Sequence, residues 1–64
     1  MKQEYKGYKP GDRIEMIYMD DIQAIPSGTQ GMIDYIDDIG QLHMKWDNGR
    51  TLAVNLDVDI IEKV

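Results

Sequence analysis

Two pairs of adjacent aspartates, Asp20-Asp21 and Asp37-Asp38, come closest to a chemical site in this 64-residue sequence. Calcium and magnesium take oxygen ligands, so paired carboxylates are candidates for a cation site. Neither pair has the ligand spacing of a known calcium loop, and aspartate also favours turns because it accepts hydrogen bonds from nearby backbone. We therefore expect turn formation and solubility from both pairs, and no metal or other cofactor. If the two loops lie at the same end of the fold, the four carboxylates converge and can recruit a basic partner.

The sequence offers little material for catalysis. His43 is the only histidine, and it lies between Gln41 and Lys45 on the polar face of a predicted strand. No nucleophile lies near it in the sequence, because Ser27 and Thr29 belong to an expected turn. The chain has no cysteine, and a single histidine cannot form a structural zinc site, which needs several cysteine or histidine ligands. The sequence therefore predicts that the protein is not an enzyme.

Large aromatic side chains near strand ends are candidate binding residues. Trp46 shares a strand face with Leu42 and Met44, which predicts burial. A tryptophan at the end of a strand can instead lie beside the loops and anchor a ligand. Tyr18 is expected on the core-facing side of its strand, and Tyr35 on the outer side of the next strand.

Charge is distributed unevenly: residues 1–9 sum to +2 and the other 55 residues to −7, for a net charge of −5. An acidic body repels phosphate, which argues against nucleic-acid binding and against adsorption to anionic membranes. Lys45 and Arg50 flank one predicted hairpin, and we expect them to pair with nearby aspartates such as Asp47. Such surface pairs add little net stability, and a local phosphate contact at Lys45 and Arg50 stays open.

Apolar side chains are expected on the outer surface where the first strand meets the following loop. Ile17 and Met19 lie on the outer side of the predicted strand, and Ile22 follows in the loop. A contiguous exposed apolar patch marks an interface, whereas isolated apolar residues do not. If these three side chains align, they form a face for a second copy of the chain or for a protein partner.

The elements that position these residues follow from the turns and from the alternation of apolar side chains. Alternation over residues 13–18 and 41–47 predicts strands, and the spacing of Ile33 and Ile36 indicates a bulge or bend between them. Asp47-Asn48-Gly49 predicts a hairpin turn, because Asn-Gly accepts positive φ. The pattern predicts an all-β fold: a small five-stranded barrel or roll of residues 10–64, preceded by a flexible N-terminal leader of residues 1–9. The strands are expected at 13–18, 32–37, 41–46, 50–54 and 60–64.

Three segments together resemble a known family: residues 9–21 (KPGDRIEMIYMDD), 25–31 (IPSGTQG) and 37–49 (DDIGQLHMKWDNG). In this order they are similar to the bacterial and phage domain-of-unknown-function family 4314, over about residues 9–62. The resemblance implies an SH3-like fold and an origin in bacteria, their phages or mobile elements, and it implies no activity. More distantly, the turn into the bent strand is similar to nucleic-acid-binding SH3-like modules, from which this acidic chain departs in charge.

Three functions remain open, beside the alternative that the chain is an accessory piece of a larger assembly with no separable activity. The leading hypothesis is a small non-enzymatic module that binds a protein partner through an acidic, aromatic-bearing loop end. The second is a phage-type protein that sequesters a nucleotide or other small molecule, as an oligomer because one small barrel offers little pocket. Nucleic-acid binding is the third. The polar start lacks the apolar core of a signal peptide and no stretch approaches the roughly 20 apolar residues of a membrane span, so a cytoplasmic protein is expected. The candidate binding residues are Tyr18, Asp20, Asp21, Tyr35, Asp37, Asp38, Trp46 and Arg50.

Overall fold

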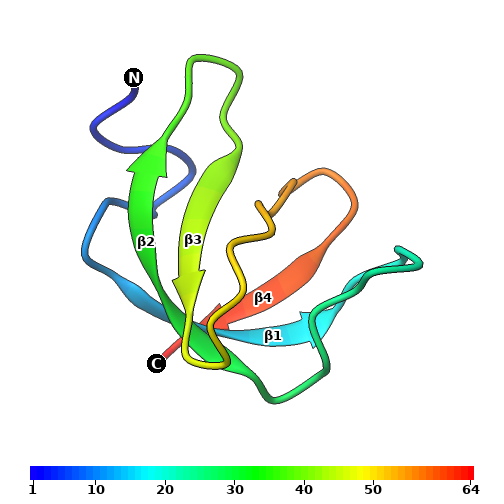
Figure 1. The fold of residues 1–64 in the computed structure, drawn as a ribbon. Coiled ribbons are helices and arrows are strands. Elements are labelled where there is room, and N and C mark those ends of the chain that lie inside the picture. The colour runs from blue at the N-terminus through cyan, green and yellow to red at the C-terminus, as the bar shows by residue number, and fades with distance from the viewer.

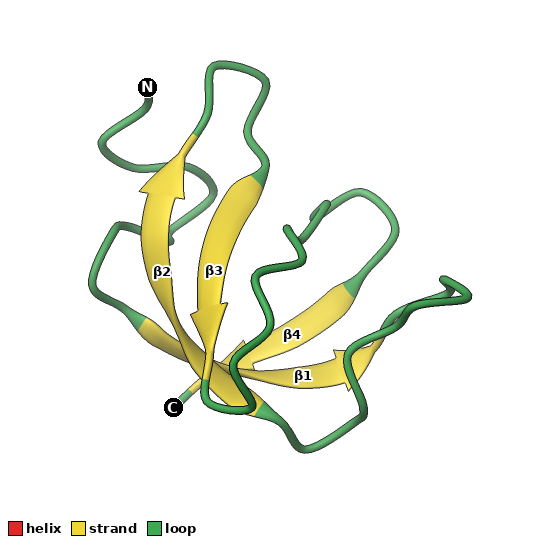
Figure 2. Cartoon of the chain, viewed as in Figure 1, coloured by secondary structure: helices red, strands yellow, loops and turns green.

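The computed structural model describes residues 1–64 and is all-β, with four antiparallel strands in one open sheet (Figures 1 and 2). The strands are β1 (Arg13–Tyr18), β2 (Gln30–Ile36), β3 (Leu42–Trp46) and β4 (Ile60–Lys63). Their order across the sheet is β3-β2-β1-β4, so β3 and β4 are the edges. The all-β prediction is confirmed. The structure has no helix long and apolar enough to cross a membrane.

Alternation of apolar side chains forms the core, because successive residues of a strand point to opposite faces of the sheet. Ile14 and Met16 of β1 are fully buried, and Leu42, Met44 and Trp46 of β3 are almost fully buried. The sheet curls so that these faces meet in one cluster (Figure 1). The ten buried residues are Ile14, Met16, Met19, Ile25, Ile33, Ile36, Leu42, Met44, Trp46 and Val54.

The predicted bend in β2 is confirmed. The pairing register between β2 and β3 shifts between Ile33 and Tyr35. An extra residue in one strand re-aims the side chains that follow it. Ile33 and Ile36 are therefore both buried, at 1% and 0% exposure, although they are three residues apart.

The end of β1 differs from the prediction for the same physical reason. The register between β1 and β4 shifts between Met16 and Tyr18, so strict alternation stops after Met16. Tyr18, expected in the core, is 53% exposed, and Met19, expected outside, is 8% exposed. The expectations for these two side chains were wrong because alternation was extended through a bulge.

The predicted fifth strand at residues 50–54 is also wrong. This segment meets β3 only at its ends, through a bond from Trp46 N to Arg50 O (3.0 Å) and an isolated bridge between Leu42 and Val54. Midway, the Leu52 carbonyl accepts a hydrogen bond from the indole Nε1 of Trp46 (2.9 Å). The carbonyl is thus bonded to a side chain rather than to a β ladder, and the sheet stays open.

Residues 1–9, expected to be a flexible leader, lie against β2 and the β2–β3 turn (Figure 1). Lys2 N donates to Ile36 O (2.8 Å), and Tyr5 and Tyr8 exchange two backbone hydrogen bonds of 2.9 Å. Both tyrosines pack on the core cluster. A Cβ at Gly40 would lie 2.6 Å from the Tyr5 ring, so this glycine permits the close approach. The mobility of the segment stays a prediction.

Candidate functional site

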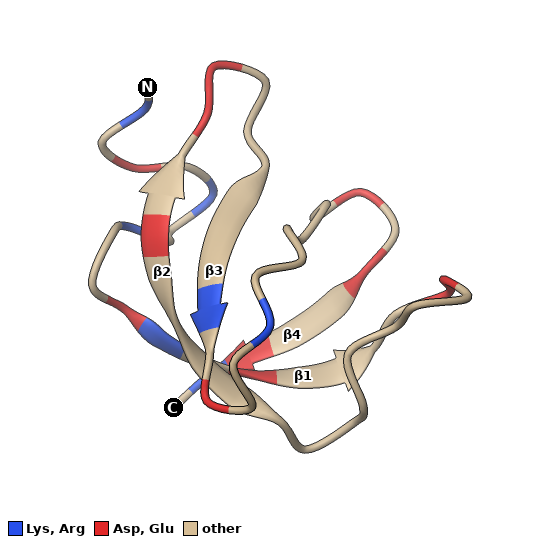
Figure 3. Ribbon diagram, in the orientation of Figure 1, with Lys and Arg blue, Asp and Glu red and all other residues tan.

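The two aspartate pairs lie in separate loops, Asp20-Asp21 between β1 and β2 and Asp37-Asp38 between β2 and β3. The two loops project from the sheet in different directions (Figure 3). No group of three or more histidine, cysteine, aspartate or glutamate side chains is placed to hold a metal ion. The four carboxylates therefore do not converge, and each pair has to be considered separately.

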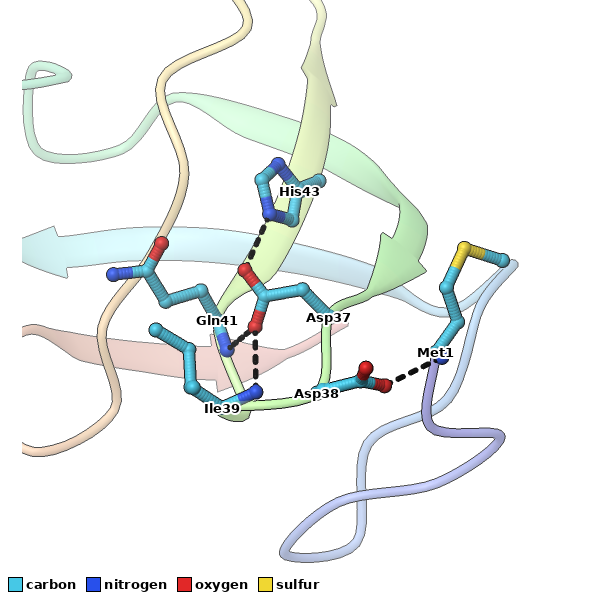
Figure 4. Close-up of polar contacts among 6 residues, drawn as sticks. All are labelled: Met1, Asp37, Asp38, Ile39, Gln41 and His43. Carbon is cyan, nitrogen blue, oxygen red and sulfur yellow. Dashed lines mark hydrogen bonds and ion pairs between the residues drawn. The ribbon is translucent and has the colours of Figure 1, made fainter.

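The β2–β3 turn is built around the side chain of Asp37 (Figure 4). Its Oδ1 accepts hydrogen bonds from the backbone N–H groups of Ile39 (3.2 Å) and Gln41 (2.9 Å). Its Oδ2 lies 2.8 Å from Nε2 of His43. The hydrogen bond from His43, followed by that from Gln41, lowers the pKa of Asp37 from its usual value. Asp37 is a turn residue whose two oxygens are both engaged within the chain.

His43 lies between Asp37 and the aromatic ring of Tyr35. The two rings are stacked, with centroids 4.2 Å apart and planes inclined by 5°. The side chain of His43 is 29% exposed, so it is half-buried rather than a free surface histidine. Its hydrogen-bond partner is the carboxylate of Asp37. Tyr35, His43 and Asp37 thus contact one another in series, and these contacts hold the Asp37 side chain in the β2–β3 turn.

The remaining acidic residues of the two loops differ in how far they are engaged. Asp38 is 87% exposed, and its Oδ1 accepts a hydrogen bond from the Met1 amine (2.6 Å), which lowers the pKa of Asp38 (Figure 4). Asp21 Oδ1 accepts a hydrogen bond from Gln23 N (2.7 Å), as in an Asx turn. Asp20 is exposed and makes no hydrogen bond or ion pair in the structure. Asp20 is thus the most available carboxylate of the β1–β2 loop.

The aromatic candidates divide between core and surface. Trp46 is 3% exposed, and its one polar atom is satisfied by Leu52 O, so it stabilises the core and presents nothing to a ligand. Tyr18 is exposed and lies opposite Ile60 of β4, which is itself 56% exposed. The sequence did not indicate that Ile60 lies beside Tyr18, because this neighbour is set by the pairing of β1 with β4, which are far apart in the chain.

Arg50 has different partners from those expected. Its guanidinium donates to the carbonyls of Ala24 (Nη1–O 3.2 Å) and Gln23, and so ties the β1–β2 loop to the segment after the hairpin. The expected partner, Asp47, instead accepts two hydrogen bonds from Arg13, at 3.1 and 2.6 Å. The sequence did not indicate that Asp47 pairs with Arg13 instead of Arg50, because Arg13 and Asp47 become neighbours only when the strands pair.

The predicted interface of Ile17, Met19 and Ile22 is not one continuous exposed patch. Ile17 is 36% exposed and Ile22 fully exposed, but Met19 between them is in the core. The exposed apolar residues also include several that were not expected. These are Tyr18, Met32, Ile39, Val58, Ile60 and Val64.

An open pocket of about 470 Å³ lies between the N-terminal segment and β2. Lys2 and Lys9 contribute positive charge to its wall, and Asp34 and Tyr35 contribute from β2. Lys9 is paired with Asp12 at 3.0 Å. The sequence did not predict this pocket, because residues 1–9 were expected to be flexible. The lining residues are Met1, Lys2, Gln3, Lys9, Pro10, Asp34 and Tyr35.

The surface has more carboxylates than cations to pair with them. Every lysine and arginine has a partner within the chain: a carboxylate, a backbone carbonyl or, for Lys2, the ring of Tyr5. Six of the twelve acidic residues have no cationic partner. Three of these six, Glu15, Asp21 and Asp59, accept a hydrogen bond from an amide N–H group. The other three are Glu4, Asp20 and Glu62. The chain therefore has negative charge available at its surface and little free positive charge.

Comparison with known proteins places the whole chain within one family model. The model described as "Domain of unknown function (DUF4314)" matches residues 1–64, including the nine residues before the predicted barrel. No curated protein and no solved structure matches the chain.

Proposed function

This chain belongs to the DUF4314 family, and we propose that it is a small, SH3-like, non-enzymatic module that binds a basic protein partner. The strand order β4-β1-β2-β3, with residues 50–54 beside β3, supports the SH3-like assignment. The proposal includes the bacterial or phage origin and the cytoplasmic location that the sequence led us to expect. The proposed binding surface is a broader acidic surface and not the single acidic loop end expected from the sequence, because the two aspartate loops are separate (Figure 3).

The observation that carries the proposal is that carboxylates outnumber the cations available to neutralise them. Six carboxylates have no cationic partner, whereas every lysine and arginine is already held within the chain. A partner rich in lysine or arginine is attracted by such a surface, and complementary charge speeds encounter and selects against acidic partners. The many phosphates of a nucleic-acid backbone are repelled by the same charge, which favours a protein over a nucleic acid.

Capture from cells of the native host tests this proposal. The bait variant Asp20→Asn/Glu62→Gln removes two free carboxylates, and the control Asp34→Asn/Asp57→Asn removes two that already hold lysines. We expect a partner with excess lysine and arginine, bound more weakly at high salt and lost more strongly from the first variant. Equal recovery with both variants and the unmodified chain contradicts the acidic-surface proposal.

The pocket favours a second function, binding of a small anionic molecule such as a nucleotide. Its open volume of about 470 Å³ lies within the range of small-molecule sites, and Lys2 is the lining cation without a carboxylate partner. A thermal-shift panel of nucleotides tests it. A nucleotide that raises the melting temperature of the chain, but not of Lys2→Ala, supports this function. No shift across the panel argues against it.

A further inference from the structure

The outer edge of β4 is an unpaired edge of the sheet. β4 pairs with β1 alone, and residues 60–63 take part in no backbone hydrogen bond outside that ladder. Unpaired N–H and C=O groups on an edge strand are a template for another strand. Because burying such groups without partners is costly, they are expected to face solvent.

The side chains beside this edge alternate in a way that suits an added strand. Ile60 and Glu62 are two residues apart, and both are exposed. Ile60 lies opposite Tyr18, and Glu62 lies opposite Glu15. An apolar pair and an acidic pair therefore follow one another along β1 and β4, where acidic segments of the two strands adjoin (Figure 3).

The acidic pair has no cation to neutralise it. Directly opposite residues of antiparallel strands have Cβ atoms about 4.5–5.5 Å apart, and like charges there are destabilising. Glu15 accepts a hydrogen bond from the neutral amide of Gln30 (3.2 Å). The nearest cations along the strands are engaged elsewhere, Arg13 with Asp47 and Lys63 with Asp12. One positive charge placed beside the Glu15–Glu62 pair would therefore reduce the repulsion.

We propose that the free edge of β4 binds an extended segment of the partner protein by strand addition. An arginine or lysine of that segment lies beside Glu62, and an apolar side chain two residues away lies beside Ile60. This inference rests on the proposed function and adds to it the docking surface and the spacing of the recognised residues. Charge complementarity selects this occupant over a second copy, since each copy carries a net charge of −5.

The test uses the synthetic peptide Ser-Val-Thr-Arg-Thr-Val-Ser, blocked at both ends. Its sequence reads the same in both directions, so a parallel or an antiparallel strand presents arginine two residues from valine. The control peptide has glutamate in place of arginine. Backbone amide spectra and hydrogen exchange of the full chain are recorded with each peptide, and light scattering reports the oligomeric state.

We expect the arginine peptide to shift resonances of β4 and of the facing part of β1, and to protect β4 amides that point away from β1. The glutamate peptide should do neither. If the arginine peptide shifts only resonances of the acidic loops, the proposal that the partner binds at the β4 edge is wrong, and the acidic-surface proposal stands. No binding by the arginine peptide or by lysine- and arginine-rich proteins overturns both. Protection of the same amides in a peptide-free dimer overturns the proposed occupant.

Discussion

Glu62 of β4 lies directly opposite Glu15 of β1, and no lysine or arginine neutralises the pair. Like charges directly opposite one another on antiparallel strands are destabilising, so we expect a single substitution to relieve repulsion at this sheet edge. Natural proteins often keep such destabilising arrangements at sites of function. The pair therefore links the stability of the sheet to its proposed binding role.

Glu62→Lys should stabilise the fold. The substitution places an ammonium opposite Glu15 and replaces repulsion with attraction, which is worth about 0.5–1 kcal/mol at a surface strand pair. Urea unfolding measures the gain. The matched control is Glu4→Lys, which changes the net charge equally at a carboxylate that has no strand partner. If both variants have the same stability, the cross-strand repulsion is not significant.

Acid should weaken the β2–β3 turn through Asp37. Its pKa is lowered in the folded chain from the ordinary value of 3.8, mainly by His43. The stabilisation is therefore present above that ordinary value and is lost as the pH falls through the folded pKa. Asp37→Asn should lower the free energy of unfolding at neutral pH and make it fall less steeply in acid, as measured by urea midpoints from pH 7 to pH 2. Asp20→Asn, at an unpartnered carboxylate, should leave the pH profile unchanged, and an equal effect would contradict this account.

Docking of the N-terminal segment should depend on Tyr5. Its ring packs on the core cluster and approaches Gly40 closely. Because the ring is half-buried, Tyr5→Ala should cost about 1–3 kcal/mol, below the cost for a fully buried aromatic residue. The Lys2 amide, bonded to Ile36 O, should be protected from exchange in the wild-type chain and lose protection in this variant. Glu4→Ala is the control, and an unprotected Lys2 amide in the wild-type chain would instead show a mobile leader.

Arg50 should set the order of the β1–β2 loop. Arg50→Lys keeps the charge but loses the planar fork that binds two carbonyls at once. Amides in residues 19–29 should then exchange faster, while those of β2 and β3 stay protected. Lys45→Arg serves as the control, because Lys45 contacts only the side chain of Asp34 among charged groups. Unchanged exchange in the loop would show that the two carbonyl contacts do not order it.

Local patterns in the sequence were sufficient to predict most of the sheet. The alternation in β3 and the first part of β1, and the spacing of Ile33 and Ile36, depend on residues close together in the chain, and they gave the strands and the bend in β2. The end of β1 was missed because its bulge is defined against β4, more than forty residues later. The predicted fifth strand at residues 50–54 does not form, and the Leu52 carbonyl midway along it accepts a hydrogen bond from the Trp46 indole instead of joining a β ladder.

The candidate site was predicted less well, because it depends on contacts between distant segments. Residue types indicated that Asp37 forms a turn, but they did not indicate the stacking of Tyr35 on His43. Two other features depend on strand register. One is the Arg13–Asp47 ion pair, which leaves Arg50 to bind loop carbonyls, and the other is the position of Glu15 opposite Glu62. Neither follows from local sequence.

The affinity of the arginine peptide for two charge-matched variants tests the central claim most directly. Glu62→Lys and Asp20→Lys change the net charge equally, at the β4 edge and in the β1–β2 loop. Calorimetry should show binding to Glu62→Lys weakened by about tenfold or more, the effect of losing one charge-assisted contact, and binding to Asp20→Lys changed by less than about threefold, as for a distant screened charge. Equal weakening in both variants, or none in Glu62→Lys, would contradict binding at the β4 edge.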